Sequence, residues 1–381
     1  MTKVEDAGTP ALDRRPPGKK GAKQCKRRSH AFAVLVRTLT LSVVFLVVFR
    51  PCGFAQDRQP VSMAEGKRFV TDMTGRQVAV PKQVKRIVTL GPVPVLNSFI
   101  FALGEGDKIV NGLPRFARSP HYKYQTLFAP ALAHQPEIQG SIGGPFDIEA
   151  LVKASPDVIF TMDRMTADVL EKHGFAVVVL SWREPDDVKR LMLLVGEVLD
   201  RQNAATEYTR YFDDTVARVR HVVSRIPQEQ RPKVLYCNIG GLTQPHLIAE
   251  WWIETAGGIS VTNNGRMVES FHFSHEQLLV WNPDVLIVSS PEDVKKVYED
   301  RRFLTIKAVK SHRVFVAPIA AHLWANRTVE QPLTVLWAAK IFYPEQFRKL
   351  DLPKEMEYFY GRFFHYRMSD LEAQEILNRK F

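Results

Sequence analysis

The stretch from Glu184 to Ile226 carries apolar side chains at every third or fourth position and contains no proline after Pro185. This spacing is typical of an amphipathic helix, whereas a strand would show strict alternation. The pattern is interrupted at residues 200–203, so it predicts one helix over 187–199 and a second over 203–225. The second helix would be about 33 Å long at a rise of 1.5 Å per residue. It is therefore long enough to connect two lobes.

The chain on either side of this stretch alternates between strand and helix signals, as parallel βαβ units do. In the first half we expect a hairpin at 68–81, a strand and a helix within 85–104, a strand at 108–114, a helix and a strand within 146–162, and a strand at 175–182. In the second half we expect a strand at 233–240, a helix at 246–258, a helix and a strand within 273–290, a strand at 313–318 and a helix at 328–344.

The sequence therefore predicts an α/β fold with two Rossmann-like lobes, each built on a central parallel sheet. We expect a first lobe over 68–185, connecting helices over 186–226 that include the interlobe backbone helix, and a second lobe over 230–381. The second lobe would include a C-terminal helical extension. A ligand would then bind in the cleft between the lobes.

Residues 1–55 are predicted to be a secretory signal peptide. A basic segment over 14–28 precedes an apolar run over 31–49, and small residues stand before a cleavage point after Ala55. The alternative is a retained membrane anchor, because the apolar run of 19 residues is just long enough to span a bilayer. In both cases the globular part would be exported to the periplasm, either free or tethered.

The net charge of +11 belongs mostly to this leader. Residues 1–55 contain eleven Lys and Arg and three Asp and Glu, a net +8, so the remainder carries only +3. Nucleic-acid binding is therefore not expected. Two of the three cysteines, Cys25 and Cys52, also lie in the leader, which leaves Cys237 alone and excludes an internal disulfide from the mature protein.

Two segments of the chain, DIEALVKASPDVIFTMD from Asp147 and SHEQLLVWNPDVLIVSS from Ser274, correspond to each other. In each, a capping residue begins a helix with a glutamate in its first turn, and a Pro-Asp-Val sequence and a hydrophobic strand follow. A glutamate at this position stabilises the helix dipole by about 0.3–1 kcal/mol. That effect explains Glu149 and Glu276 individually, but it does not explain why they occupy matched positions.

These features, taken in order, resemble the helical-backbone (class III) substrate-binding proteins of ABC importers for iron–siderophores, haem and cobalamin. The resemblance covers roughly residues 68–345. It depends on V-T-D-x-x-G-R-x-V-x-V-P near 70–81, the K-R-I-V strand, the stretch from Gly140 with I-E-A-L and P-D-V-I, the segment S-x-E-Q-L-L-x-x-x-P-D-V-L-I-V, and the long helical stretch.

The resemblance implies two lobes joined by one long helix, ligand binding in the cleft and a small closing motion. It also implies that Glu149 and Glu276 pair with arginines of a membrane permease, which works with its ATPase subunits. Surface carboxylates of this kind act mainly through orientation and association rate. The other partner would be a small-molecule chelate, and the protein is expected to be monomeric.

In an open α/β sheet, ligands bind beyond the carboxyl ends of the strands. The loops at those positions are rich in arginine, histidine and aromatic residues, which bind anionic oxygens and flat apolar groups. Each arginine could instead form a structural ion pair, and each tryptophan could pack in the core. The candidate ligand-binding residues are Arg115, Arg118, His121, Tyr122, Trp182, Arg183, His246, His272, His322, Trp324 and Arg327.

The expected ligand is a metal chelate, with iron as the metal and a ferric siderophore as the first candidate. The chain has no dense carboxylate or Cys/His cluster suited to a bare metal ion, and no intrinsic cofactor is expected. His322 or His121 could complete the coordination of a chelated metal. Haem would need Tyr122, His121 or His322 as its axial ligand. Cobalamin, a nickel or cobalt chelate and a molybdate-type oxyanion are further alternatives.

An enzymatic function is not expected, because the sequence contains no G-x-S-x-G elbow, no H-E-x-x-H and no P-loop. The alternatives from other functional classes are a secreted enzyme on the same scaffold and a membrane-tethered sensor that never meets a permease.

Overall fold

The computed structural model describes residues 66–379, so the predicted signal peptide and its cleavage point lie outside the described residues. The predicted long helical stretch is confirmed as two helices, α5 (Pro185–Val198) and α6 (Gln202–Val223). Asp200 takes a left-handed backbone conformation between them, with φ of 58°. A Cβ on Gly196 would lie 2.5 Å from Ala205 Cβ, so glycine is what allows the two helices to approach so closely.

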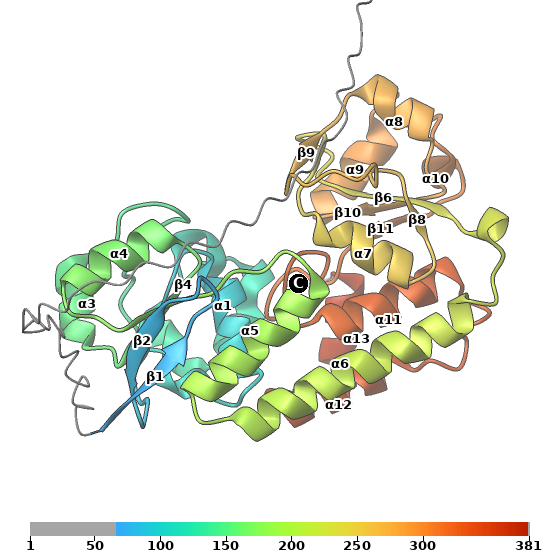
Figure 1. Cartoon of the computed structure of the whole chain (residues 1–381). Coiled ribbons are helices and arrows are strands. Elements are labelled where there is room, and N and C mark those ends of the chain that lie inside the picture. Colours follow the sequence, from blue (N-terminus) through green and yellow to red (C-terminus); the bar gives the residue numbers. More distant parts are fainter. Residues whose placement is uncertain (1–65, 380–381) are drawn as a thin grey trace, which may run out of the picture. The chain divides into compact units, whose positions relative to one another are not determined.

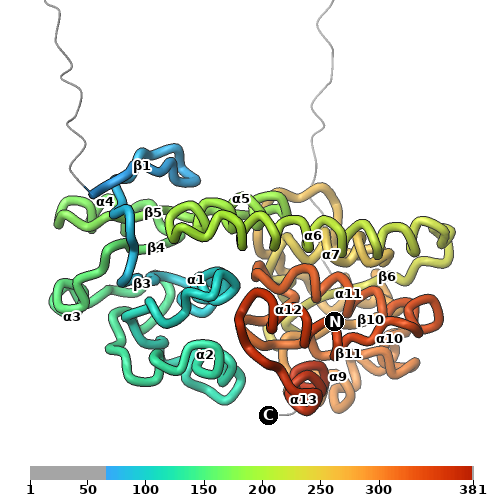
Figure 2. The backbone as a smooth tube through the Cα atoms, turned by 90° about the horizontal axis from the view of Figure 1, so that it is seen from below, coloured from blue at the N-terminus to red at the C-terminus, as the bar shows by residue number. Residues whose placement is uncertain are grey.

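The helix α6 packs its apolar stripe against its neighbours rather than crossing open solvent. Tyr208, Phe212 and Val219 are buried in the core, as the sequence pattern predicts. The stripe faces α5 and α11 (Gln331–Phe342), and Figure 2 shows α6 running past both. One apolar core continues through both halves of the described chain. The lobes are therefore joined through packed surfaces as well as through a helix.

The first sheet has three parallel strands in the order β3-β4-β5. All residues of β3 and β4 are buried, as expected for strands with helices on both faces. A separate hairpin of β1 and β2 confirms the antiparallel pair predicted near the start. The elements are β1 (Lys67–Thr71), β2 (Gln77–Pro81), β3 (Ile87–Leu90), α1 (Val93–Phe101), α2 (Lys123–Phe128), α3 (Ile148–Ala154), β4 (Val158–Thr161), α4 (Arg164–Lys172) and β5 (Val177–Val179).

The second sheet has four parallel strands in the order β11-β10-β6-β8 (Figure 1). A separate two-stranded antiparallel pair is formed by β7 and β9, which come between β6 and β10 in the sequence. The elements are β6 (Lys233–Cys237), β7 (Thr243–Gln244), α7 (Ile248–Thr255), β8 (Ile259–Ser260), β9 (Phe271–His272), α8 (His275–Trp281), β10 (Val285–Val288), α9 (Pro291–Glu299), α10 (Lys307–Lys310) and β11 (Val314–Val316). The predicted α/β fold with parallel sheets is thereby confirmed.

The C-terminal extension consists of α12 (Leu352–Phe363) and α13 (Asp370–Asn378), which pack against each other. A capping box of Ser369 and Glu372 begins α13. The helix also reaches the first half of the chain, because Glu375 pairs with Lys123 of α2. Short 3₁₀ turns complete the described chain: η1 (Gly106–Lys108), η2 (Arg115–Arg118), η3 (Pro120–Tyr122), η4 (Pro130–His134) and η5 (Gln228–Gln230).

The matched Pro-Asp sequences have a structural purpose in both halves. Asp157 Oδ2 accepts hydrogen bonds from the backbone N–H groups of Lys85 and Arg86, just before β3. Asp284 Oδ2 accepts the equivalent bond from Lys233 N at the start of β6. Each aspartate thus fixes the beginning of the neighbouring strand. This accounts for the Pro-Asp repeat independently of the glutamates in the preceding helices.

The strand predicted at 108–114 is wrong. This segment forms the end of η1 and a single bridge between Ile109 and Ile87. The side chain of Asn111 takes the place of a neighbouring strand, since it accepts from Thr89 N and donates to Thr89 O. A Cβ on Gly112 would lie 2.3 Å from Gln135 O, so the chain passes another backbone segment too closely for a regular strand.

The described residues, 66–379, belong to one compact unit. The lobe boundaries given above stay a prediction. Within residues 66–379 no helix is both long enough and apolar enough to cross a membrane.

Candidate functional site

A cavity of about 570 Å³ lies at the carboxyl ends of the strands, between the two sheets. Its size is within the range of small-molecule sites. The second half of the chain contributes four lining residues, His246, His322, Asn326 and Arg327, and all four have nitrogen-bearing side chains. The first half contributes mostly apolar side chains and backbone. The cavity therefore has one polar, nitrogen-rich wall and one largely apolar wall.

The first-half wall is formed where α1 and α4 begin, and by the loop around residue 142. Pro92 and Pro94 have no backbone N–H, so the start of α1 offers few donors to a ligand. Gln139 fixes this wall, because its Oε1 accepts from Gly91 N and its Nε2 donates to Gly144 O. The apolar members of this wall are Val95, Phe116, Ile142, Met162 and Trp182.

Arg327 connects the two walls. Its Nη1 donates to the backbone O of Trp182 at 2.8 Å, and its guanidinium lies over the Trp182 ring at 5.7 Å. Its Nε lies 3.4 Å from Glu269 Oε1. Burial lowers the pKa of the Arg327 side chain, and the charge of Glu269 opposes that change. The guanidinium remains charged because its ordinary pKa is above 12. It is the principal positive charge lining the cavity.

Glu269 also organises His246. His246 Nδ1 lies 2.9 Å from Glu269 Oε1, and this contact leaves Nε2 as the free ring nitrogen. Burial acts to raise the pKa of Glu269, but the hydrogen bond with His246 and the charge of Arg327 outweigh it and lower the pKa. Histidines that bind a metal through one ring nitrogen usually have the other ring nitrogen held by a carboxylate in this way.

His322 is kept neutral by its surroundings. Burial lowers the pKa of His322 to about 3, and the neighbouring His246 and Arg327 act in the same direction. Its Nδ1 is buried and has no hydrogen-bond partner among the described residues. Tyr122 stacks on the imidazole with 6.0 Å between ring centroids, and Phe116 meets Tyr122 edge-on at the same separation. A neutral imidazole can donate to an anionic oxygen or coordinate a metal.

The loop that carries His322 is held from behind by the buried carboxylate of Glu330. This carboxylate accepts from Ala321 N and His322 N, each at 3.0 Å, and from the hydroxyls of Thr328 and Tyr360. Burial raises the pKa of Glu330, and these four bonds oppose the rise. On the other side, Gln125 Nε2 in α2 donates to Ala321 O. The loop is thus fixed to both halves of the chain.

The structure brings five of the predicted ligand-binding residues together in the lining: Tyr122, Trp182, His246, His322 and Arg327. The other six do not line this cavity. Arg115, Arg183 and His272 are exposed, and Arg118 donates to Leu113 O and pairs with Glu137. His121 is half-buried, and Trp324 is fully buried in the core. The role of each in ligand binding stays a prediction.

Several lining or supporting residues escaped the sequence analysis, namely Gln139, Asn326, Asp163, Glu269 and Glu330. Asp163 caps α4 through Met165 N and Thr166 N, which is what its position before that helix would suggest. The sequence immediately around the other four residues does not indicate these roles. Their roles depend on which distant backbone groups they meet.

Glu149 and Glu276 are both exposed, in the first turns of α3 and α8. The two helices begin with side-chain caps from Asp147 and Ser274, and both end in left-handed residues. Figure 1 shows α3 and α8 at the ends of the two lobes away from α6. The hydrogen bond with Ser274 lowers the pKa of Glu276, which keeps it ionised. Docking through these glutamates stays a prediction.

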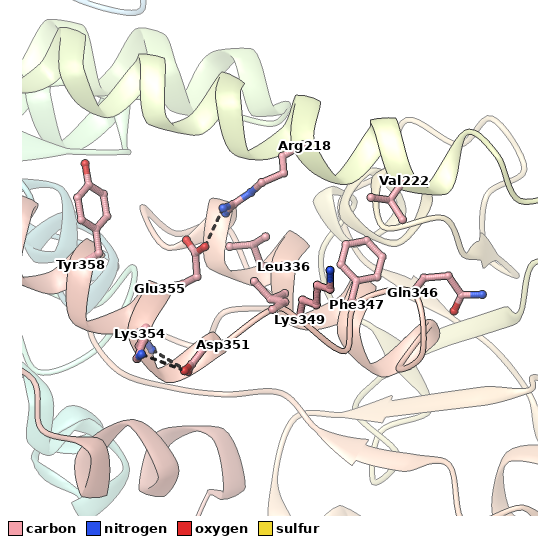
Figure 3. A pocket seen from close by; sticks show the side chains of 11 residues that line it. Arg218, Val222, Leu336, Gln346, Phe347, Lys349, Asp351, Lys354, Glu355 and Tyr358 are labelled. Atoms are coloured by element: carbon pink, nitrogen blue, oxygen red, sulfur yellow. Dashed lines mark hydrogen bonds and ion pairs between the residues drawn. The ribbon is translucent and has the colours of Figure 1, made fainter.

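A second hollow of about 530 Å³ lies between α6 and α12 (Figure 3). Two ion pairs lie within its lining, because Arg218 binds Glu355 and Lys354 lies near Asp351, and Lys349 lines the hollow as well. Within residues 66–379 no three His, Cys, Asp or Glu side chains form a group that could hold a metal ion.

The chain is similar to known proteins along most of its length. A family model described as periplasmic binding protein matches residues 97–321. The molybdate-binding protein MolA of Haemophilus influenzae is 24% identical over an alignment of 325 residues, and the match covers 78% of this chain and 91% of that protein. The structure of MolA bound to molybdate aligns with a TM-score of 0.69 at 23% identity, covering 79% of this chain and 99% of that chain.

Two further structures share the fold. A periplasmic solute-binding protein from Veillonella parvula aligns with a TM-score of 0.71 at 28% identity, covering 82% of this chain and 97% of that chain. CeuE of Helicobacter pylori with bound Ni(II) aligns with a TM-score of 0.66 at 17% identity, covering 81% and 99% of the two chains.

Proposed function

The chain belongs to the periplasmic binding protein family, and from that premise we propose that it captures an anionic metal chelate and delivers it to the permease of an ABC importer. The family and its relatives are solute-binding proteins rather than enzymes. The first candidate for the ligand is a ferric siderophore. The protein would act in the periplasm, exported by its N-terminal segment.

The two-faced cavity is the observation that supports a chelate. The nitrogen-rich wall of His246, His322, Asn326 and Arg327 suits anionic oxygens or an incompletely coordinated metal. The opposite wall suits the apolar part of an organic molecule. A chelate presents both surfaces. Haem, cobalamin and a nickel or cobalt chelate also present both kinds of surface and are further alternatives.

A molybdate-type oxyanion is the second candidate, and a different observation favours it. The relative MolA is named as molybdate-binding, and its similarity extends over most of both chains. A bare oxyanion would use the N–H donors of the polar wall and leave the apolar wall without a partner. Its affinity would then depend on Arg327 and the two histidines.

Titration of the exported, purified protein tests this function. Trp182 lines the cavity, so a ligand that enters should quench tryptophan fluorescence saturably. Ferric siderophores, haemin, cobalamin, nickel–histidine and molybdate form the panel. Arg327→Gln should raise the Kd of the bound ligand by about tenfold, the loss of roughly one charge-assisted hydrogen bond. Arg301→Gln, an exposed change away from the cavity, is the matched control and should leave Kd unchanged.

Delivery is tested separately, by uptake in cells. Reversing both Glu149 and Glu276 to lysine should abolish uptake while ligand binding by the purified protein is retained, because both side chains are exposed and neither lines the cavity. Uptake equal to that of the unmodified protein would contradict the importer function and favour a sensor. Silence across the whole ligand panel would contradict the receptor function itself.

A further inference from the structure

A smaller hollow of about 300 Å³ adjoins the ligand cavity on the first half of the chain. Tyr122 belongs to the lining of both, so this residue lies between them. The turns η2 and η3 form the rest of the partition. Phe116 of η2 lines the ligand cavity, whereas Ala117 and Arg118 of the same turn line the smaller hollow. Two adjacent spaces thus share one thin wall.

The wall is built from short turns rather than from a helix or sheet. The turn η2 has four residues and η3 has three, and neither has a side-chain cap. Such turns are among the less stable parts of a fold, because few backbone hydrogen bonds hold them. Tyr122 is kept in place by ring contacts with Phe116 and His322. Tyr122 is the one residue that the two linings have in common.

The smaller hollow has its own electrostatic character. Its lining includes two cationic side chains, Arg118 and Lys123, and no carboxylate. Their anionic partners, Glu137 and Glu375, lie outside the lining. Both pairs are partly exposed to solvent, and pairs of that kind are weak. A carboxylate entering the hollow could therefore exchange with Glu137 or Glu375 at low cost.

We propose that this hollow is a second subsite, which takes a carboxylate-bearing arm of the chelate whose metal centre lies in the main cavity, with Tyr122 as the partition between them. The proposal rests on the function proposed above and narrows its substrate class to chelates with a free anionic arm. It also gives Arg118 a role in ligand binding, although this residue does not line the main cavity.

Isothermal titration calorimetry with two probes tests the subsite. Ferric citrate carries carboxylates beyond the metal centre, whereas molybdate is small enough for the main cavity alone. Ala133 is exposed and lines only the smaller hollow, so Ala133→Trp fills that hollow without disturbing the core. Arg118→Gln removes a charge from the same lining. Leu127→Trp places the same indole side chain at an exposed position of α2 outside both linings and is the control.

We expect Ala133→Trp and Arg118→Gln each to weaken ferric citrate binding at least tenfold and to change molybdate binding less than twofold. Leu127→Trp should leave both unchanged. An unchanged Kd for ferric citrate in the two variants, an equal loss for both probes, or molybdate binding with which ferric citrate cannot compete would overturn the subsite while the proposed receptor function stands. Absence of binding by either probe and by every member of the earlier panel would overturn both.

Discussion

His322 should make the stability of this protein depend on pH in the mildly acidic range. Its pKa of about 3 in the folded chain lies far below the usual value of 6.5, because the imidazole is buried beside His246 and Arg327. The unfolded chain therefore binds a proton at His322 between pH 6.5 and pH 3, and the folded chain does not. The contribution of the neutral His322 to the free energy of unfolding is complete above pH 6.5, and it is lost progressively as the pH decreases below that value.

The size of the effect follows from the two pKa values. Between pH 7 and pH 5 the unfolded state gains about 2 kcal/mol from protonation of this one histidine, as an upper limit because the cavity admits water. Urea unfolding followed by circular dichroism at pH 7, 6 and 5 measures the loss. His322→Gln keeps a polar side chain at the position but cannot titrate, so its loss over the same range should be smaller by up to that amount.

His134→Gln is the matched control, because His134 is exposed at the end of η4. That variant should lose stability with acid as the unmodified protein does. If His322→Gln and the unmodified protein lost equal stability between pH 7 and pH 5, the imidazole would be protonated normally in the folded state. The account of a neutral, ligand-ready His322 would then be wrong.

Three further changes test the scaffold, each by urea unfolding at pH 7. Glu330→Gln replaces one carboxylate oxygen with an amide N–H, which would face the N–H and O–H groups that donate to the carboxylate. The free energy of unfolding should fall by about 2–4 kcal/mol, and a fall below 1 kcal/mol would contradict the role of Glu330 in holding the loop that carries His322. Gly112→Ala brings a Cβ to 2.3 Å from Gln135 O, so about 1–3 kcal/mol should be lost, and an unchanged midpoint would refute the close approach. Asn111→Leu leaves both backbone groups of Thr89 unpaired and should cost about 2–4 kcal/mol, whereas a neutral result would show that water replaces the amide.

The helical stretch over 184–226 shows how much of the fold could be predicted locally. Its apolar period, its missing prolines and its interruption near Asp200 all depend on residues close together in the chain, and the two helices begin and end within two residues of the predictions. The same holds for the repeated capped helix and strand that begin at Asp147 and Ser274. Local propensity and burial agree in these elements, so periodicity identifies them.

The segment at 108–114 shows where local reasoning failed. Its residues have strand propensity, but Asn111 bonds Thr89 through its side chain and Gly112 passes close to Gln135. Both partners are distant in sequence. A side chain that imitates a strand cannot be distinguished from a strand by composition alone.

The sequence by itself determined the fold class, the connecting helices and the types of residue that the strand-end loops bring to a ligand. Only the tertiary structure decided which of them meet. Tyr122, Trp182, His246, His322 and Arg327 share one cavity, whereas Trp324, two positions from His322, is turned into the core. Glu269 pairs with His246 and Arg327 of the lining, and Glu330 holds the loop that carries His322. The sequence around these two glutamates does not indicate either role. A loop side chain is directed by backbone hydrogen bonds and packing from elements far along the chain, and its neighbours exist only once the chain has folded.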